Sequence, residues 1–216
     1  SIRLVGSEMC IRDSSHSSFI DKVEMSNLCQ EITLPTKPIQ HIDDDSGEIA
    51  LCILSAINIG KIRDVSDLKS LCDLSVRSLD ELIDFQGYPV QAAEIATKAR
   101  RSLGIGYIGL AHYLAKQGVK YEDPKAWELV HDLTEAFQYH LIESTVNLAK
   151  EKGACEYSDR TKYAQGILPI DTYKKDVDEL VPNNLKYDWE TLRALVKEHG
   201  VRNSTLSAQM PSESSS

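Results

Sequence analysis

The stretch IALCILSAINIG, residues 49–60, carries the clearest fold signal in the sequence. It is a run of apolar residues that follows an acidic turn, HIDDDSGE at 41–48, and ends at a glycine. A short apolar run bounded by turn residues is typical of a buried strand. We therefore predict a buried strand here, which carries Cys52, and expect the preceding EITLPTKP, 31–38, to be a strand stopped by its prolines.

Helical periodicity follows the apolar run. Ser66 can cap a first helix. Asp123 and Pro124 predict the start of a second helix, which ends at Gly153. Residues 188–200 are predicted to form a third helix, with capping residues at both ends. Apolar spacings of three and four residues predict which side chains face the core. These are Leu68, Cys72, Ser75, Leu79 and Leu82 in the first helix, and Val130, Leu133, Phe137, Leu141 and Leu148 in the second.

Two further stretches of small and apolar residues, LGIGYIG at 103–109 and NSTLSAQM at 203–210, fit strands. Strands that alternate with helices indicate an α/β fold with a largely parallel sheet. The chain has no internal repeat and no linker-like segment, so we expect one domain or part of a larger one.

The composition limits the possible partners. The 216 residues are 42% hydrophobic and 26% charged, which is ordinary for a globular protein, and the net charge is −9. A surface for nucleic acid or an anionic membrane needs clustered Lys and Arg, so we expect neither partner. No apolar run approaches the roughly 20 residues that span a bilayer, and no secretory signal is evident, so we expect a cytoplasmic protein.

The five cysteines are scattered and show no CxxC spacing, and the six histidines form no HxxxH or HExxH pattern. We therefore expect no metal site and no disulfide scaffold. Cytosolic thiols are kept reduced, so a redox-active cysteine in this chain would be catalytic instead of structural.

The stretch SNLCQE, residues 26–31, places a thiol between an amide and a carboxylate. In an extended segment Asn27, Cys29 and Glu31 would point to the same side. The simplest interpretation is a small buried thiol with polar neighbours. A nucleophilic cysteine would need a histidine base, and nothing marks His16 or His41 as one. A nearby carboxylate raises a thiol pKa, so the trio suits a protonated thiol better than a thiolate.

Two other motifs suggest phosphate binding. GIGYIG, 104–109, matches the G-x-G-x-x-G of dinucleotide-binding folds, but the preceding 93–102 is helix-like and no acidic residue on a strand follows about 20 positions later, so structural glycines are favoured. MPSESSS, 210–216, offers hydroxyls that can cradle a phosphate. By composition alone, a serine tail or a helix cap is the simpler interpretation.

Together these segments resemble the large, catalytic subunit of class I ribonucleoside-diphosphate reductases. The resemblance rests on the order and spacing of SNLCQE, GEIALC, RRSLGIGYIG, GILPIDTYKKD and WETLRALVKEHGVRNSTLSAQMPSESSS. It implies part of a ten-stranded α/β barrel, with residues 16–216 running from its finger loop to its phosphate-binding loop. Residues 1–15, which include Cys10, do not look like the family, and we expect them to be a non-native junction.

The resemblance also implies roles for individual residues. Cys29 matches the cysteine whose thiyl radical abstracts the 3′ hydrogen of a ribonucleoside diphosphate, Glu31 the carboxylate that takes the 3′ hydroxyl proton, and Asn27 the amide that binds the sugar hydroxyls. Cys52 matches one of two cysteines that reduce the substrate radical and become a disulfide. The implied substrate-binding residues are Asn27, Leu28, Cys29, Gln30, Glu31, Pro211, Ser212, Glu213, Ser214 and Ser215.

The implied partners are a small radical-generating subunit that holds the metal cofactor, thioredoxin or glutaredoxin as reductant, and a second copy of the parent chain. The resemblance implies no cofactor in this chain, and it places the ATP and deoxynucleotide effector sites in regions that the chain lacks. We expect the 216 residues alone to be an inactive fragment. The alternative is a non-catalytic α/β interaction module with structural cysteines; a nicotinamide-dependent oxidoreductase built on GIGYIG has less support.

Overall fold

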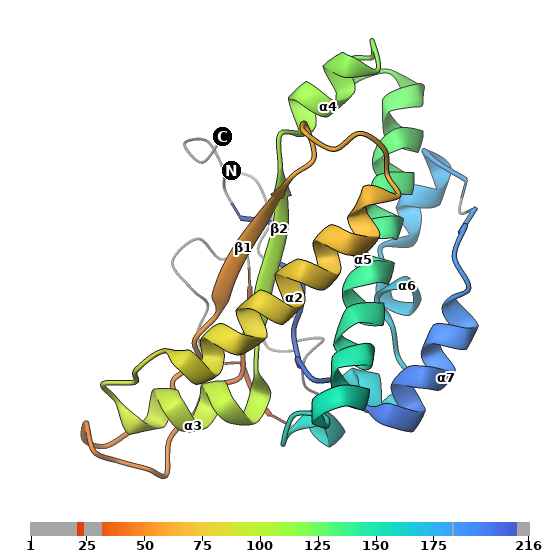
Figure 1. The fold of residues 1–216 in the computed structure, drawn as a ribbon. Coiled ribbons are helices and arrows are strands. Elements are labelled where there is room, and N and C mark those ends of the chain that lie inside the picture. The colour runs from red at the N-terminus through yellow and green to blue at the C-terminus, as the bar shows by residue number, and fades with distance from the viewer. Residues whose placement is uncertain (1–20, 24–31, 183, 211–216) are drawn as a thin grey trace.

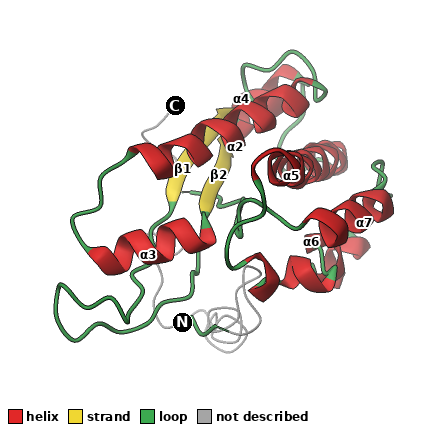
Figure 2. Cartoon of the chain, turned by 60° about the horizontal axis from the view of Figure 1, so that its bottom comes forward, coloured by secondary structure: helices red, strands yellow, loops and turns green. Residues whose placement is uncertain are grey.

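The computed structural model describes residues 21–23, 32–182 and 184–210 (Figure 1). Two parallel strands, β1 (Ile53–Asn58) and β2 (Leu103–Ile108), pair in register from Ile53 opposite Leu103 to Asn58 opposite Ile108. The chain crosses from β1 to β2 through helices α2 (Asp67–Phe85) and α3 (Gln91–Arg100). Helix α2 lies across one face of the strands, and α3 lies at their lower end in Figure 1. Figure 2 shows the same unit from another side. This β-α-β unit is the α/β arrangement that the sequence predicts.

The remaining helices follow β2. They are α4 (Leu110–Lys116), α5 (Pro124–Lys152), α6 (Pro169–Thr172) and α7 (Trp189–His199), with short 3-10 turns at η1 (Ser158–Arg160), η2 (Lys162–Gln165) and η3 (Lys175–Glu179). Helix α5 lies between the strands on one side and α6 and α7 on the other (Figure 2). The predicted ends of α5 and α7 are confirmed, and the Asp188 side chain caps α7 by accepting the Thr191 N–H at 3.0 Å.

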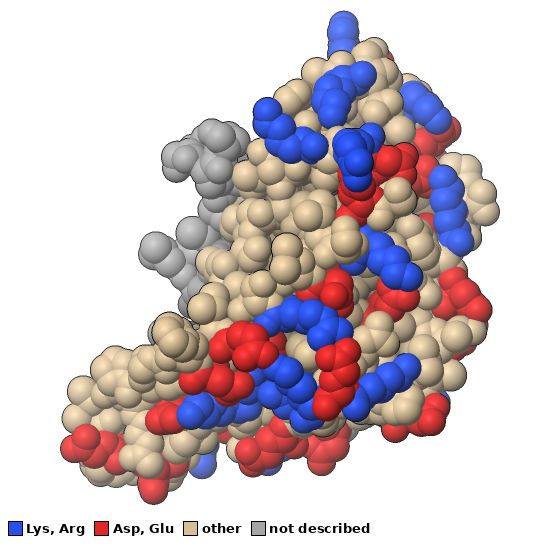
Figure 3. Space-filling view, in the orientation of Figure 1, with Lys and Arg blue, Asp and Glu red and all other residues tan. Residues whose placement is uncertain are grey.

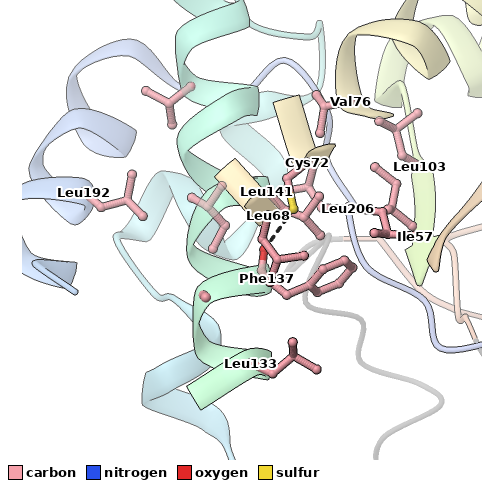
Figure 4. Packing of buried hydrophobic residues seen from close by; sticks show 14 of the residues in the cluster. Ile57, Leu68, Cys72, Val76, Leu103, Leu133, Phe137, Leu141, Leu192 and Leu206 are labelled. Atoms are coloured by element: carbon pink, nitrogen blue, oxygen red, sulfur yellow. Dashed lines mark hydrogen bonds between the residues drawn. The ribbon is translucent and has the colours of Figure 1, made fainter. Parts of the chain in front are cut away.

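The core forms where α2 packs against α5 and both meet the strands. Figure 4 shows Leu68, Cys72 and Val76 facing the α5 side chains. The prediction for α2 was wrong at two positions, because Val76 and Ile83 are buried where Ser75 and Leu82 were expected. The predicted stripe alternates spacings of four and three residues, slightly less than the 3.6 residues per turn of an α-helix, so it falls one residue short of the buried face at positions 75 and 82.

Two details of the first helix and strand also differ from prediction. Ser66 is the residue before α2, but its hydroxyl makes no capping hydrogen bond. Strand β1 begins at Ile53, so Cys52 lies one residue before the strand instead of within it. β1 is also less buried than expected: within the strand only Ile57 is buried, and Leu54 is 49% exposed.

Neither of the other predicted strands is formed as such. Residues 32–38 form no continuous strand: Thr33 and Lys37 are isolated bridge residues, Lys37 paired with Glu48, because the prolines limit further pairing. Residues 203–210 form one bridge, Ile105 to Ser207, although they run beside β2 on the edge opposite β1. The acidic turn at 41–48 is confirmed as a turn.

The surface carries mixed charge. On the face drawn in Figure 3, Lys and Arg lie next to Asp and Glu over α2 and α5. Arg77 of α2, for example, pairs with Asp73 at 2.9 Å and with Glu151 of α5 at 2.6 Å. Exposed pairs such as these contribute little to stability.

Candidate functional site

Cys52 is the one predicted site residue that lies within the described part of the chain. Residues 27–31 and 211–215 lie outside it. The described chain nevertheless reaches the edges of both segments, because Ile32 follows Glu31 and Met210 precedes Pro211. The position of these flanking residues relative to Cys52 can therefore be compared directly.

Described residues next to the two other predicted site segments converge on Cys52. Ile32 and Leu34 form a small apolar cluster with Ala208, and Cys52 and Ala50 pack against this cluster. Cys52 itself is partly buried. Segments that are far apart in the sequence thus meet within side-chain contact of the Cys52 thiol.

Strand β2 provides the floor of this region. A Cβ on Gly104 would stand 2.5 Å from the Cys52 Sγ and 3.2 Å from the Ala208 Cβ. A Cβ on Gly106 would stand 2.6 Å from the Ala208 oxygen and 2.7 Å from the Met210 Sδ. Residues two apart on a strand share a face, so both glycines lie under the site. Any larger residue would displace the thiol or the 208–210 segment.

This packing decides between the two interpretations of GIGYIG. The first two glycines lie inside β2 and contact protein side chains, whereas a dinucleotide-binding motif places them in the turn after a strand. The preceding residues 91–100 are helix α3, as the sequence suggested. The glycines are therefore structural.

A buried polar network holds the start of the 203–210 segment. The Asp80 carboxylate, 0% exposed, accepts hydrogen bonds from Arg101 Nε at 2.6 Å, Asn203 Nδ2 at 3.0 Å and Arg202 Nε at 3.2 Å. The Asn203 amide oxygen accepts a further bond from the Thr145 hydroxyl at 3.0 Å. A buried charge is tolerated only when it is paired in this way, so the network fixes where the segment begins beside β2.

A second buried arginine, Arg100, holds the chain ahead of Cys52. Its guanidinium is 4% exposed and pairs with Glu48 at 2.7 Å and with Asp21 at 3.1 Å. Its guanidinium carbon lies 4.9 Å from the centre of the Tyr157 ring. One sequence signal points to both networks, the adjacent Arg100 and Arg101 before β2, but no local pattern shows that α2 buries Asp80 opposite that pair.

The other described cysteines differ from Cys52. Cys72 is fully buried, and its thiol lies 3.8 Å from the Phe137 carbonyl oxygen (Figure 4). Burial raises the pKa of the Cys72 thiol to about 12, and burial also raises that of Cys155 to about 12. Both thiols stay protonated at neutral pH, so they are packing residues, as the helical stripe predicted for Cys72.

An apolar groove of about 570 Å³ lies away from Cys52, between α4, α5 and residues 169–185. Its walls include Trp127, Val130 and Ile170. Within residues 21–23, 32–182 and 184–210, no cluster of His, Cys, Asp and Glu could hold a metal ion. A search of the same residues finds no helix with the length and apolar character needed to cross a membrane.

Comparison with known proteins agrees with this geometry. The family model for the ribonucleotide reductase barrel domain matches residues 9–216. The chain is 59% identical over 206 residues to the ribonucleoside-diphosphate reductase subunit alpha of Haemophilus influenzae. It is 54% identical over 206 residues to the ribonucleoside-diphosphate reductase 1 subunit alpha of Escherichia coli K12. Each match covers 94% of this chain and 27% of the relative.

A viral relative is also similar. The subunit alpha of the enzyme from Enterobacteria phage T4 is 45% identical over 196 residues, which cover 90% of this chain and 25% of that protein. The chain thus spans about a quarter of the length of the relatives it matches. Because the family model covers nearly the whole chain, this protein belongs to the ribonucleotide reductase family and forms part of its α/β barrel domain.

Proposed function

We propose that the protein containing this chain reduces ribonucleoside diphosphates to 2′-deoxyribonucleoside diphosphates. The observation that carries the proposal is the convergence of residues 32–34, Cys52 and residues 208–210 on the glycine face of β2. The printed names of the relatives, ribonucleoside-diphosphate reductase subunit alpha, support the same reaction. The enzyme is accordingly an oxidoreductase.

The proposed chemistry assigns a role to each predicted site residue. A thiyl radical on Cys29 takes the 3′ hydrogen from the ribose, and Glu31 takes the proton of the 3′ hydroxyl, while Asn27 binds the sugar hydroxyls. The 2′ hydroxyl leaves as water, and two thiols, Cys52 and a partner thiol elsewhere in the parent protein, supply two electrons and two protons as they become a disulfide. Glu31 then gives the proton back to the 3′ oxygen, and Cys29 returns the hydrogen to C3′ and regains its radical. Residues 211–215 bind the substrate phosphates.

The proposed chemistry requires a neutral thiol at position 29. The neighbouring Glu31 carboxylate fits this requirement, because a nearby negative charge opposes thiolate formation.

The partners in the proposal are a small subunit that holds the metal and generates the radical, thioredoxin or glutaredoxin as reductant, and a second parent chain. The proposed location is the cytoplasm. Residues 16–216 form the barrel piece and residues 1–15 a non-native junction. We expect the 216-residue chain alone to be inactive, because it spans about a quarter of the length of its relatives.

The test is a Cys29→Ser variant of the full-length parent protein. Serine keeps the shape of cysteine, but its O–H bond is too strong for the radical exchange, so we expect nucleoside diphosphate binding without turnover. Cys72→Ser is the matched control, because Cys72 lies in the α2 and α5 core and should leave turnover intact. Turnover in the Cys29→Ser variant would exclude the radical assignment.

A further inference from the structure

The edge of β2 opposite β1 carries hydrogen bonds to the segment that leads to the predicted phosphate-binding residues. The Leu103 N–H donates to the Thr205 oxygen at 2.9 Å and the Ile105 N–H to the Leu206 oxygen at 2.8 Å. The Ile105 oxygen accepts from the Ala208 N–H at 3.1 Å. The two bonds of Ile105 form a parallel bridge to Ser207, whereas the Leu103 bond is shifted by one residue from the register that this bridge would continue.

At Tyr107, two residues farther along β2, the bonds to the segment come from a side chain instead of the main chain. The Tyr107 N–H donates to the Gln209 Oε1 at 3.3 Å, and the Gln209 Nε2 donates to the Tyr107 oxygen at 2.7 Å. A carboxamide offers one acceptor and a donor in the same plane, as a peptide group does. Gln209 therefore occupies the place of the next peptide unit.

The main chain cannot make this step because it has turned over the face of β2. The Ala208 oxygen and the Met210 side chain both lie above Gly106, within 2.7 Å of the point that a Cβ there would occupy. Pro211 follows at once and has no N–H to donate to a ladder. Among the described residues, the Ala208 N–H makes the last main-chain hydrogen bond to β2, and the Gln209 side chain makes the two bonds that follow it.

We infer that Gln209 is a positioning residue that sets the direction in which the chain enters residues 211–215. The inference rests on the proposed function, because it takes those residues as the phosphate-binding site. Gln209 is exposed, so its two hydrogen bonds add little to folding stability. Their effect is to hold Met210 over Gly106 and so to fix the start of the phosphate-binding segment.

Equilibrium binding to the full-length parent protein tests the inference, with cytidine diphosphate and cytidine as probes. In Gln209→Leu, which keeps the length and loses both hydrogen bonds, we expect the Kd for the diphosphate to rise about 3- to 10-fold and the Kd for cytidine to stay within twofold. Gln209→Glu removes the donor to the Tyr107 oxygen and should weaken diphosphate binding at least as much. Ser207→Ala, exposed in the same segment, is the control and should change neither Kd.

Two outcomes would overturn the inference: an unchanged Kd for the diphosphate, or an equal loss for both probes, which would indicate a general structural defect. The thermal midpoint of Gln209→Leu should stay within about 2 °C of that of the wild type. Turnover is measured separately. A wild-type protein that binds the diphosphate without reducing it would contradict the proposed function, while the pattern of Kd values would still support the role of Gln209.

Discussion

The Cys52 sulfur lies so close to the α-carbon of Gly104 that a methyl group on that carbon would stand 2.5 Å from the sulfur. Non-bonded heavy atoms settle at about 3.5–4.0 Å, so the absence of a side chain at position 104 is what allows the thiol to lie against β2. The same methyl group would stand 2.6 Å from a Leu54 methyl carbon, so the thiol has no free space on that side.

Gly104→Ala in the full-length parent protein should therefore displace Cys52 and reduce deoxynucleotide formation by more than tenfold. Overpacking of this kind costs about 1–3 kcal/mol, so the thermal midpoint should fall by a few degrees. Gly87→Ala is the matched control, because a Cβ there would meet no atom within 4 Å. Full activity in Gly104→Ala would show that the thiol does not depend on this contact.

Cys52→Ser should prevent clean reduction of the substrate radical, because serine cannot form the disulfide that supplies two electrons. We expect substrate consumption to stop or to divert to side products, with no 2′-deoxynucleotide in a chromatographic product assay. A normal yield of deoxynucleotide from this variant would remove Cys52 from the mechanism.

Thiol labelling of the folded parent protein separates the catalytic interpretation from the interaction-module alternative. At pH 8 almost none of Cys72 or Cys155 is thiolate, because burial raises both pKa values to about 12. We expect iodoacetamide to modify Cys52 in the native protein and the other two only in denaturant, as read by peptide mass spectrometry. Equal protection of all three cysteines would favour the module with structural cysteines.

The two buried thiols also predict a loss of stability in alkali. Each has a folded pKa of about 12, above the value of about 8.5 expected when unfolded, so its contribution is complete below pH 8.5 and is lost as pH rises toward 12. At pH 10 the loss is about 2 kcal/mol for each thiol. The drop in thermal midpoint from pH 8 to pH 10 should be smaller in a Cys72→Ala and Cys155→Ala double variant; an equal drop would contradict this account.

Asp80→Asn should destabilise the protein strongly. The change leaves the buried Arg101 and the nearby Arg202 without their shared carboxylate, which typically costs about 3–5 kcal/mol. Asp84→Asn is the control, because Asp84 contacts the same Arg101 but its side chain is 50% exposed, so its loss should cost about 1 kcal/mol or less. Similar thermal midpoints for the two variants would show that the network is not essential.

Local signals account for the features that were predicted correctly. Asp123 with Pro124 and Gly153 mark the ends of α5, and Asp188 with Gly200 mark those of α7, because a cap depends only on residues next to the helix end. The apolar run at 49–60 likewise gave the position of β1 to within a few residues. The resemblance to a known family, and not any one pattern, pointed to Cys52 as a site residue.

The features that were missed depend on contacts between distant segments. Residues 205–208 have the composition of a strand, but they form a single bridge because they turn over Gly106. The burial of Asp80 follows from two arginines that arrive from other parts of the chain. Contacts between distant segments leave no local sequence pattern, so neither feature can be predicted from neighbouring residues.

The bond between Tyr107 and Gln209 joins positions that are 102 residues apart, and this span has a consequence for the order of folding. Closing a long loop costs more conformational entropy than forming a helix from neighbouring residues, so such contacts form slowly. The β-α-β unit and α5 can assemble while residues 203–210 are still free. During that interval the Cys52 thiol lacks its cover from Ala208, which makes the newly made chain more sensitive to oxidants than the mature one.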